Sequence, residues 1–167
     1  MAGRVNLLED TMPYGQYALS PRQTRTIFAQ KGWTRVVGMS AEERSPRLEE
    51  LFGAVDLGKI HADGMFVGVP IRPVNGGLDQ PPGDSEWRGV LAQVAAGKVV
   101  LGSSGVVPRC SGPREVVFQA LCYRNLGCSH WLVPHGTEGE AARTRELFES
   151  LGDIGIAPLF LDLSVRT

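Results

Sequence analysis

Short apolar segments recur along this chain, and a segment with helix signals separates each one from the next. The apolar segments are rich in Val, Leu, Ile and Phe and cover residues 33–39, 63–71, 98–105, 129–133 and 157–163. Strands that alternate with helices of roughly 10 to 15 residues are typical of right-handed βαβ units, which build a parallel sheet covered on both faces. The pattern therefore predicts a doubly wound α/β fold with about five parallel strands.

The expected helices carry their own start and stop signals. Ser20 can cap a helix that begins with Pro21 and stops at Gly32, since a hydroxyl suits the cap and proline suits the first helical position. Thr137 and Glu140 have the spacing of a capping box, which opens a helix that ends near residue 152. The other helices are expected over residues 46–59, 85–97 and 113–127.

Composition places the chain among ordinary globular domains. Its 167 residues, 43% hydrophobic and 21% charged, favour one domain over residues 17–167 after a lead-in of residues 1–16. The net charge of −1 gives no reason to expect a nucleic-acid or membrane partner. With no apolar leader and no apolar run of membrane-spanning length, a cytoplasmic location is expected.

The cysteines and histidines do not form a metal-binding pattern. Cys110, Cys122 and Cys128 lack CxxC spacing, so they are expected to be small buried residues and not a disulfide framework or a zinc site. The histidines are scattered. No resident metal is therefore predicted.

Ligands in open parallel sheets bind beyond the carboxyl ends of the strands. Four segments are expected at that edge: residues 39–47, 70–84, 103–114 and 134–138. The sequence thus predicts where a ligand binds before it indicates which ligand.

Three stretches resemble the catalytic core of ATP sulfurylase (sulfate adenylyltransferase). Residues 110–133 (CSGPREVVFQALCYRNLGCSHWLV) are similar to the family's Gly-Pro-Arg-Glu-Ala helix and the Arg-Lys-Asn-(Tyr/Phe)-Gly-Cys-Thr-His-Phe-Ile-Val that follows it. Residues 19–39 resemble the family's helix and first strand, and residues 81–94 resemble its Lys-Pro-Gly-Asp turn and helix. With residues 155–163, the resemblance spans residues 17–164. It implies a Rossmann-like fold of the nucleotidyltransferase type, with ATP, with or without Mg²⁺, as substrate or ligand.

The family's reactive motifs are altered in this chain. Family members carry Gln-Thr-Arg-Asn-Pro and His-x-x-His after the first strand, but here Glu42 occupies the anion-binding arginine's position, and Pro46 and Glu49 replace the histidines. In the later Gly-Arg-Asp-His-Ala-Gly motif, His135 replaces the arginine and Gly136 the aspartate. Ordinary sulfate activation is therefore not expected.

Three residues near these motifs are catalytic candidates. Arg44 and Arg47 can donate to phosphate near a helix start, or they belong to a solvated, charged helix start. His135 follows a strand and can act as an acid, a base or a phosphate donor, or it is an exposed loop histidine.

The expected nucleotide- and anion-binding residues are Ser40, Arg109, Gly112, Arg114 and Val133. Arg114 lies at a helix start in the best-matched motif with Arg109 close by, and a structural salt bridge is the alternative role for both.

Two other residues are expected to be structural: His130 lies within a buried strand, and Arg124 lies near a helix end that it can cap.

Two functions fit these residues. The first is a divergent nucleotidyltransferase that binds a nucleotide and a small anionic acceptor. The second is a non-catalytic protein on the same fold that binds a nucleotide or a partner. The sequence is compatible with a homo-oligomer or a complex subunit, and fold alone does not choose between the two functions.

Overall fold

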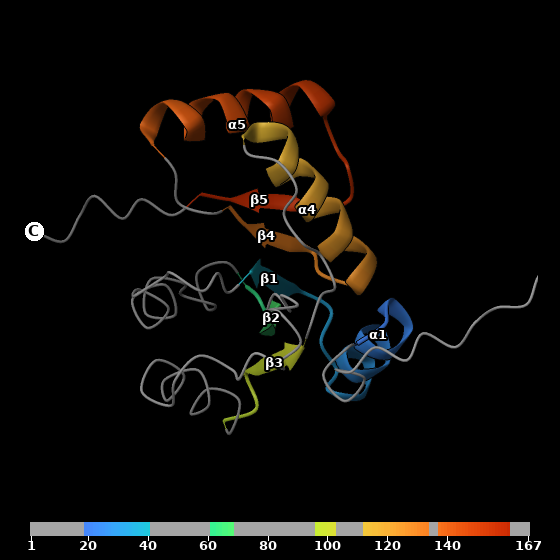
Figure 1. Cartoon of the computed structure of the whole chain (residues 1–167). Coiled ribbons are helices and arrows are strands. Elements are labelled where there is room, and N and C mark those ends of the chain that lie inside the picture. Colours follow the sequence, from blue (N-terminus) through green and yellow to red (C-terminus); the bar gives the residue numbers. More distant parts are fainter. Residues whose placement is uncertain (1–18, 41–60, 69–95, 103–111, 134–136, 161–167) are drawn as a thin grey trace, which may run out of the picture.

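The computed structural model describes residues 19–40, 61–68, 96–102, 112–133 and 137–160 (Figure 1). Within these ranges the elements are α1 Pro21–Gln30, β1 Val36–Ser40, β2 Gly64–Gly68, β3 Val99–Gly102, α4 Pro113–Leu126, β4 His130–Leu132, α5 Glu138–Leu151 and β5 Ala157–Leu159. The expected helix over 46–59 and nearly all of the one over 85–97 lie outside the described residues.

The strands form one parallel sheet in the order β3-β2-β1-β4-β5. The chain first adds strands on one side of β1 and then returns to add β4 and β5 on the other side. This is the strand order of a Rossmann-like sheet, and it reverses between β1 and β4. The predicted α/β fold with five parallel strands is confirmed.

The first strand begins later than the apolar pattern predicts. Residues 33–39 read as strand, but β1 starts at Val36. The Trp33 ring instead stacks on Phe28, with 6.0 Å between ring centroids, and lies over Gly64, where a Cβ would come within 2.4 Å of the ring. Trp33, the apolar residue ahead of the strand, therefore packs in the core and does not pair with a neighbouring strand.

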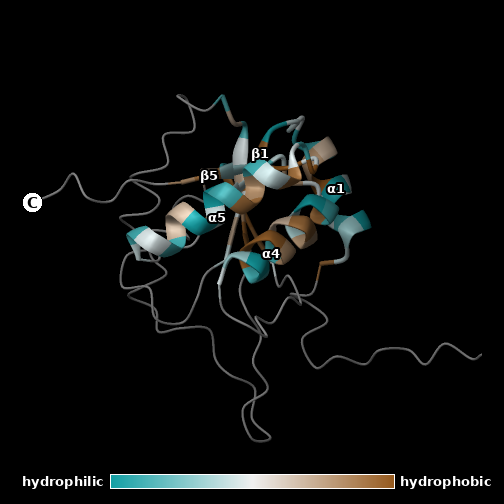
Figure 2. Cartoon of the chain, turned by 90° about the horizontal axis from the view of Figure 1, so that it is seen from above, coloured by the Kyte–Doolittle hydropathy of each residue, from teal (hydrophilic) through white to brown (hydrophobic). Residues whose placement is uncertain are grey.

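Helices α1, α4 and α5 form a layer on one face of the sheet, with α4 in contact with both of the others (Figure 1). Seen from above, the outward surface of α5 is largely hydrophilic, whereas α4 carries more apolar residues (Figure 2). None of the described helices is long and apolar enough to cross a membrane.

Both faces of the sheet are buried. Side chains alternate between the faces of a strand, and Phe66 and Trp131 on the helical side are both 0% exposed. On the opposite side, Val37, Val67 and Met65 are 2% exposed or less. Burial on both faces explains why these strands read as continuous apolar runs and not as alternating ones.

Two side chains join α4 to its neighbours. The Thr24 hydroxyl in α1 donates to the Leu126 carbonyl oxygen over 2.6 Å. The Arg124 guanidinium donates to the Ile154 carbonyl oxygen over 2.8 Å, so this side chain ties α4 to the turn before β5 and does not cap its own helix as expected. Gly127 ends α4 instead, with a φ of 103° that glycine adopts without strain.

The cysteine expectation holds in part. Cys128 is buried and Cys122 is half-buried, and both are free thiols. Burial raises the pKa of both thiols, as expected for packing residues and not for nucleophiles. Cys110 lies outside the described residues.

Candidate functional site

The candidate site lies at the carboxyl edge of the sheet, where the strand order reverses. β1 ends there at Ser40, and Val133 directly follows the neighbouring strand β4. Ser40 is half-buried. The Val133 side chain belongs to the core, and its N–H donates to the Leu159 carbonyl oxygen over 2.9 Å. Ligands of open α/β sheets bind in the crevice at this kind of switch point.

The start of α4 reaches the same edge. The end of α4 leads directly into β4, so α4 runs antiparallel to the strands and begins at their carboxyl ends (Figure 1). Its N-cap, Gly112, has φ 97° and ψ −176° and makes no side-chain cap hydrogen bond. No atom of the described residues lies within 4 Å of where a Gly112 Cβ would be. A helix N-terminus without a side-chain cap is suited to an anion.

The other two described helices are closed at their starts. Ser20 and Gln23 form a capping box on α1, and Thr137 and Glu140 form one on α5. In α5 the Thr137 N–H donates to the Glu140 carboxylate over 2.9 Å, and this bond lowers the pKa of Glu140. Two carboxylates in its first turn already occupy the positive end of α5. Among the described helices, α4 is thus the one whose N-cap residue makes no side-chain hydrogen bond.

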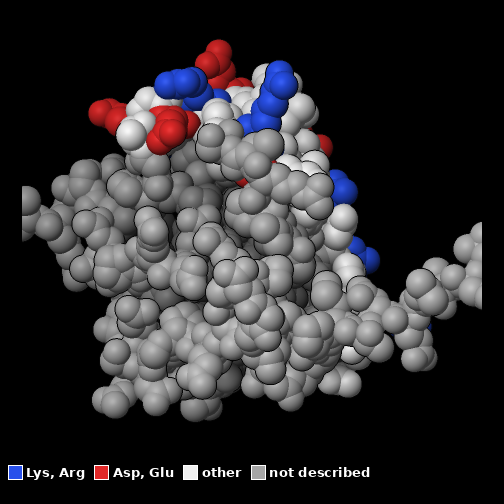
Figure 3. All heavy atoms as spheres, in the orientation of Figure 1, with Lys and Arg blue, Asp and Glu red and all other residues white. Residues whose placement is uncertain are grey.

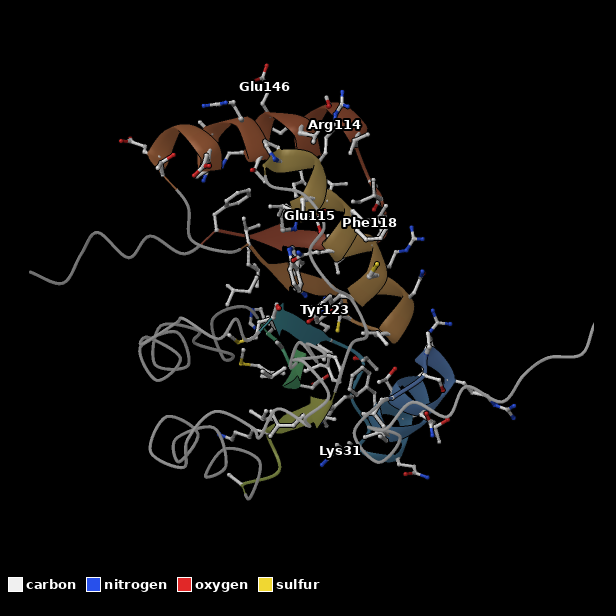
Figure 4. The ribbon with its side chains drawn as sticks, in the orientation of Figure 1. Lys31, Arg114, Glu115, Phe118, Tyr123 and Glu146 are labelled. Atoms are coloured by element: carbon white, nitrogen blue, oxygen red, sulfur yellow. The ribbon has the colours of Figure 1, made fainter. Side chains whose placement is uncertain are left out.

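Side chains of the first turn of α4 add charge of both signs. The Arg114 side chain is exposed, and Figure 4 places it at the beginning of α4, far from Tyr123, which points into the core. Glu115 is half-buried and accepts a hydrogen bond from the Gln119 amide over 3.2 Å. Within the described residues, Arg114 is the basic side chain in the first turn of α4.

The structure thus brings four of the sequence candidates, Ser40, Gly112, Arg114 and Val133, to one edge of the sheet. The other expected site residues lie outside the described ranges: Arg44, Arg47, Arg109 and His135. The described part of the chain contains no group of three side chains that could hold a metal ion.

One position at this edge was not singled out from the sequence. Gly68 ends β2 and pairs with Ser40 on one side and with Gly102 on the other, so three small residues end adjacent strands in register. The signal was a glycine within the apolar run of residues 63–71, which by itself indicates no particular site.

At the opposite edge, His130 has the structural role expected for it. The Ser129 hydroxyl oxygen lies 2.8 Å from His130 Nδ1 and accepts the Val36 N–H over 3.0 Å. This side chain therefore joins the start of β1 to the start of β4. Burial, and secondly the charge of Arg35, lowers the pKa of His130.

The lowered pKa of His130 predicts a stability that falls as the pH falls. The unfolded chain takes up the proton near the ordinary histidine pKa of about 6.5, while the folded chain takes it up only at lower pH. Unfolding therefore binds a proton in that window, and stability is lost from about pH 6.5 downward through the folded pKa. Urea unfolding at pH 7.5 and pH 5 should show this loss, and a smaller one in His130→Gln. An equal loss in the variant would contradict the assignment.

A five-stranded parallel sheet whose strand order reverses beside β1 defines a Rossmann-like α/β protein. Residues 15–165 match the family model for ATP-sulfurylase. The chain belongs to the ATP-sulfurylase family, as its motifs suggested.

Curated relatives agree with this assignment. Sulfate adenylyltransferases from Symbiobacterium thermophilum and Synechocystis are each 30% identical to the chain, in alignments that cover 97% and 95% of it and 43% of each relative. A probable bifunctional SAT/APS kinase 2 from Sorangium cellulosum is 30% identical over 95% of this chain and 29% of its own length. The chain thus spans less than half the length of these relatives.

A solved structure shares the fold. The hexameric APS kinase from Thiobacillus denitrificans superimposes with a TM-score of 0.61 and 18% identity, covering 93% of this chain and 29% of that one. At this identity the likeness concerns the architecture alone.

Proposed function

We propose that this chain is a divergent nucleotidyltransferase core that binds a nucleotide and a small anionic acceptor at the carboxyl edge between β1 and β4. The observation that carries the proposal is the uncapped start of α4 at Gly112, which lies at that edge with Arg114 in its first turn. Backbone N–H groups and a guanidinium together favour a phosphate. Relatives named sulfate adenylyltransferase support nucleotide chemistry for the family.

The reaction of such a core is an in-line transfer. An oxygen of the acceptor attacks the α-phosphorus of the nucleotide, the new P–O bond forms, and the bond to the β-phosphate oxygen breaks to release pyrophosphate. No covalent enzyme intermediate is needed, so the protein contributes orientation and stabilisation of the developing charge. Positioned cations are therefore the expected catalytic groups.

In this proposal, each site residue expected from the sequence has a role. Arg114 and Arg109 bind the phosphates at the start of α4, while Arg44, Arg47 and His135 stabilise charge around the α-phosphorus. Ser40, Gly112 and Val133 line the edge through small side chains and backbone.

The acceptor is proposed to differ from sulfate. Glu42 stands where the family's anion-binding arginine belongs, and a carboxylate repels an oxyanion. Pro46 and Glu49 replace the paired histidines, and Gly136 replaces an aspartate. These same replacements favour a second candidate, a non-catalytic core that binds a nucleotide or a partner protein. Either protein would work in the cytoplasm as one domain over residues 17–167.

Calorimetry with ATP, adenosine phosphosulfate and pyrophosphate tests the proposal, with ATP offered both with and without Mg²⁺. Binding below millimolar concentration is the expected result, and failure of all three ligands to bind at millimolar concentration would overturn both nucleotide-binding candidates. If ATP binds, release of pyrophosphate with a panel of oxyanion acceptors separates the two. Turnover supports the transferase, while binding without turnover supports the non-catalytic core.

A further inference from the structure

Helices α1 and α4 begin with nearly the same residues. Residues 20–23 read Ser-Pro-Arg-Gln, and residues 112–115 read Gly-Pro-Arg-Glu. In both helices the last of these four residues is at the N3 position, the third residue after the N-cap. A glutamine or glutamate there can reach back to the N–H of the N-cap residue. The two helix starts can therefore be compared position by position.

The N3 side chain closes the helix start in α1 and in α5. The Gln23 side-chain oxygen accepts the Ser20 N–H over 2.8 Å, and the Glu140 carboxylate accepts the Thr137 N–H over 2.9 Å. The N-cap residue is extended in both helices, with φ values of −71° and −64°. In these two helices a polar N3 side chain thus occupies an N–H group that a ligand could otherwise bind.

The N3 side chain of α4 points the other way. The Glu115 carboxylate accepts a hydrogen bond from the Gln119 amide, one turn further along the helix, over 3.2 Å. No hydrogen bond joins this carboxylate to the Gly112 N–H, and Gly112 has a φ of 97°. The Gly112 carbonyl oxygen still accepts the N–H groups of Glu115 and Val116, so the helix backbone itself begins normally. The difference therefore lies in the N-cap residue and in the Glu115 side chain.

Gln119 holds Glu115 from within the core. The Gln119 side chain is 5% exposed and lies on the same side of α4 as buried Tyr123, four residues further on. Its Oε1 atom is buried and has no hydrogen-bond partner among the described residues. Burying an amide whose oxygen is unpaired costs stability, so an apolar side chain would suit this position better. The hydrogen bond to Glu115 is what the amide adds.

The surrounding surface charge does not by itself set the charge at the start of α4. Helix α5 packs against α4, and acidic and basic side chains lie together over α5 (Figure 3). The first turn of α4 also carries one side chain of each sign, Arg114 and Glu115. The position of the Glu115 carboxylate therefore decides how much negative charge an anion at Gly112 meets.

We propose that Gln119 is a positioning residue for the anion site at the start of α4, because it holds the Glu115 carboxylate away from Gly112. The inference rests on the proposed function, in which the bound anion is a phosphate. Without the Gln119 amide, Glu115 is free to bond the Gly112 N–H, since glycine adopts the extended φ of the other N-caps as readily as a positive one. A phosphate then has to displace the carboxylate.

Gln119→Met in the whole chain tests this hold without a ligand. Methionine is as long as glutamine and adaptable in packing, but it has no amide. Hydrogen exchange of the Gly112 N–H, followed by NMR, is expected to slow by about fivefold or more, because a capping bond protects this group. The Thr137 N–H is already bonded to Glu140 and should not change. An unchanged Gly112 rate overturns the proposal, whether or not the chain binds phosphate.

Calorimetry with pyrophosphate tests the consequence for the site. Gln119→Met is expected to weaken binding by about fivefold or more, the shift that one capping interaction supports. Adding Glu115→Ala to this variant should restore the affinity of the unmodified chain, because the competing carboxylate is gone. Unchanged affinity in Gln119→Met, or a loss that persists in the double variant, would overturn the proposal. If the unmodified chain does not bind pyrophosphate, the proposed function fails, while the Gly112 exchange rate still decides the role of Gln119.

Two further variants complete the experiment. Gln30→Met makes the same chemical change at the exposed end of α1 and should leave the affinity within about twofold. Glu115→Ala alone changes a half-buried residue and keeps the test decisive if circular dichroism shows that Gln119→Met does not fold. It should bind pyrophosphate at least as tightly as the unmodified chain, and weaker binding would refute the competing role of Glu115.

Discussion

Replacing Gly38 by alanine is expected to lower the free energy of unfolding by about 1–3 kcal/mol, the usual range for overpacking a close-packed core. A Cβ at this position would lie 2.6 Å from Tyr123 Cδ1 and 3.0 Å from Cys128 Sγ. The Tyr123 ring has little room to move, since it is 1% exposed and its centroid is 4.2 Å from that of Trp131. Urea unfolding followed by fluorescence measures the change.

Gly139→Ala is the matched control for this prediction. Gly139 lies in α5, and of the described residues outside its own helix backbone and chain neighbours, a Cβ there would meet only the end of the Arg143 side chain, at 3.9 Å. The same chemical change should therefore stabilise the chain, by up to about 1 kcal/mol, because alanine loses less entropy than glycine in a helix. If the two variants changed stability in the same direction, the close approach of α4 to the sheet at Gly38 would be refuted.

Replacing Arg114 by alanine is expected to weaken binding of pyrophosphate or ATP by about 10- to 100-fold, which corresponds to one charge-assisted hydrogen bond of about 1.5–3 kcal/mol. The expected effect is on affinity and not on stability, because the Arg114 side chain is exposed. Calorimetric titration of each variant measures it. The affinity of Arg114→Lys should lie between those of the unmodified chain and Arg114→Ala, because lysine keeps the positive charge but loses the forked donors of the guanidinium.

Lys31→Ala controls for the loss of one positive charge. Lys31 follows α1 and lies over the Trp33 ring at 5.2 Å, far from the start of α4 (Figure 4). Lys31→Ala changes the net charge by the same amount as Arg114→Ala. The affinity for pyrophosphate or ATP should nevertheless stay within about twofold of that of the unmodified chain, because an exposed, distant charge is screened. If Lys31→Ala and Arg114→Ala weakened ligand binding equally, affinity would depend on the net charge of the chain and not on a site at the start of α4.

Much of the fold could be predicted because its signals are local. Ser20 caps α1 as predicted, and the capping box of Thr137 and Glu140 forms as its spacing predicts. Pro113 and Gly127 bound α4 as the sequence indicated. What failed was the role of single side chains that act across the fold: Trp33 packs where a strand was expected, and Arg124 reaches Ile154 where a cap was expected.

The candidate site was predictable only as a location. Strand ends place Ser40 and Val133 at one edge once the strands are parallel. The caps of α1 and α5 were readable from the sequence, but no local signal showed that the start of α4 at Gly112, which has no side-chain cap, reaches that same edge. The sequence pattern also could not reveal that the Arg145 guanidinium lies over the Phe160 ring.

The sequence by itself determined that five parallel strands form, where α1, α4 and α5 begin and end, and the family motif from Gly112 onward. It could do so because capping, periodicity and glycine conformation depend on residues a few positions apart. Only the tertiary structure decided that Gly38 is a point of contact for Tyr123 and that three small residues end β1, β2 and β3 in register. Those facts depend on which distant segments pack together, and side-chain volume and burial settle that in three dimensions.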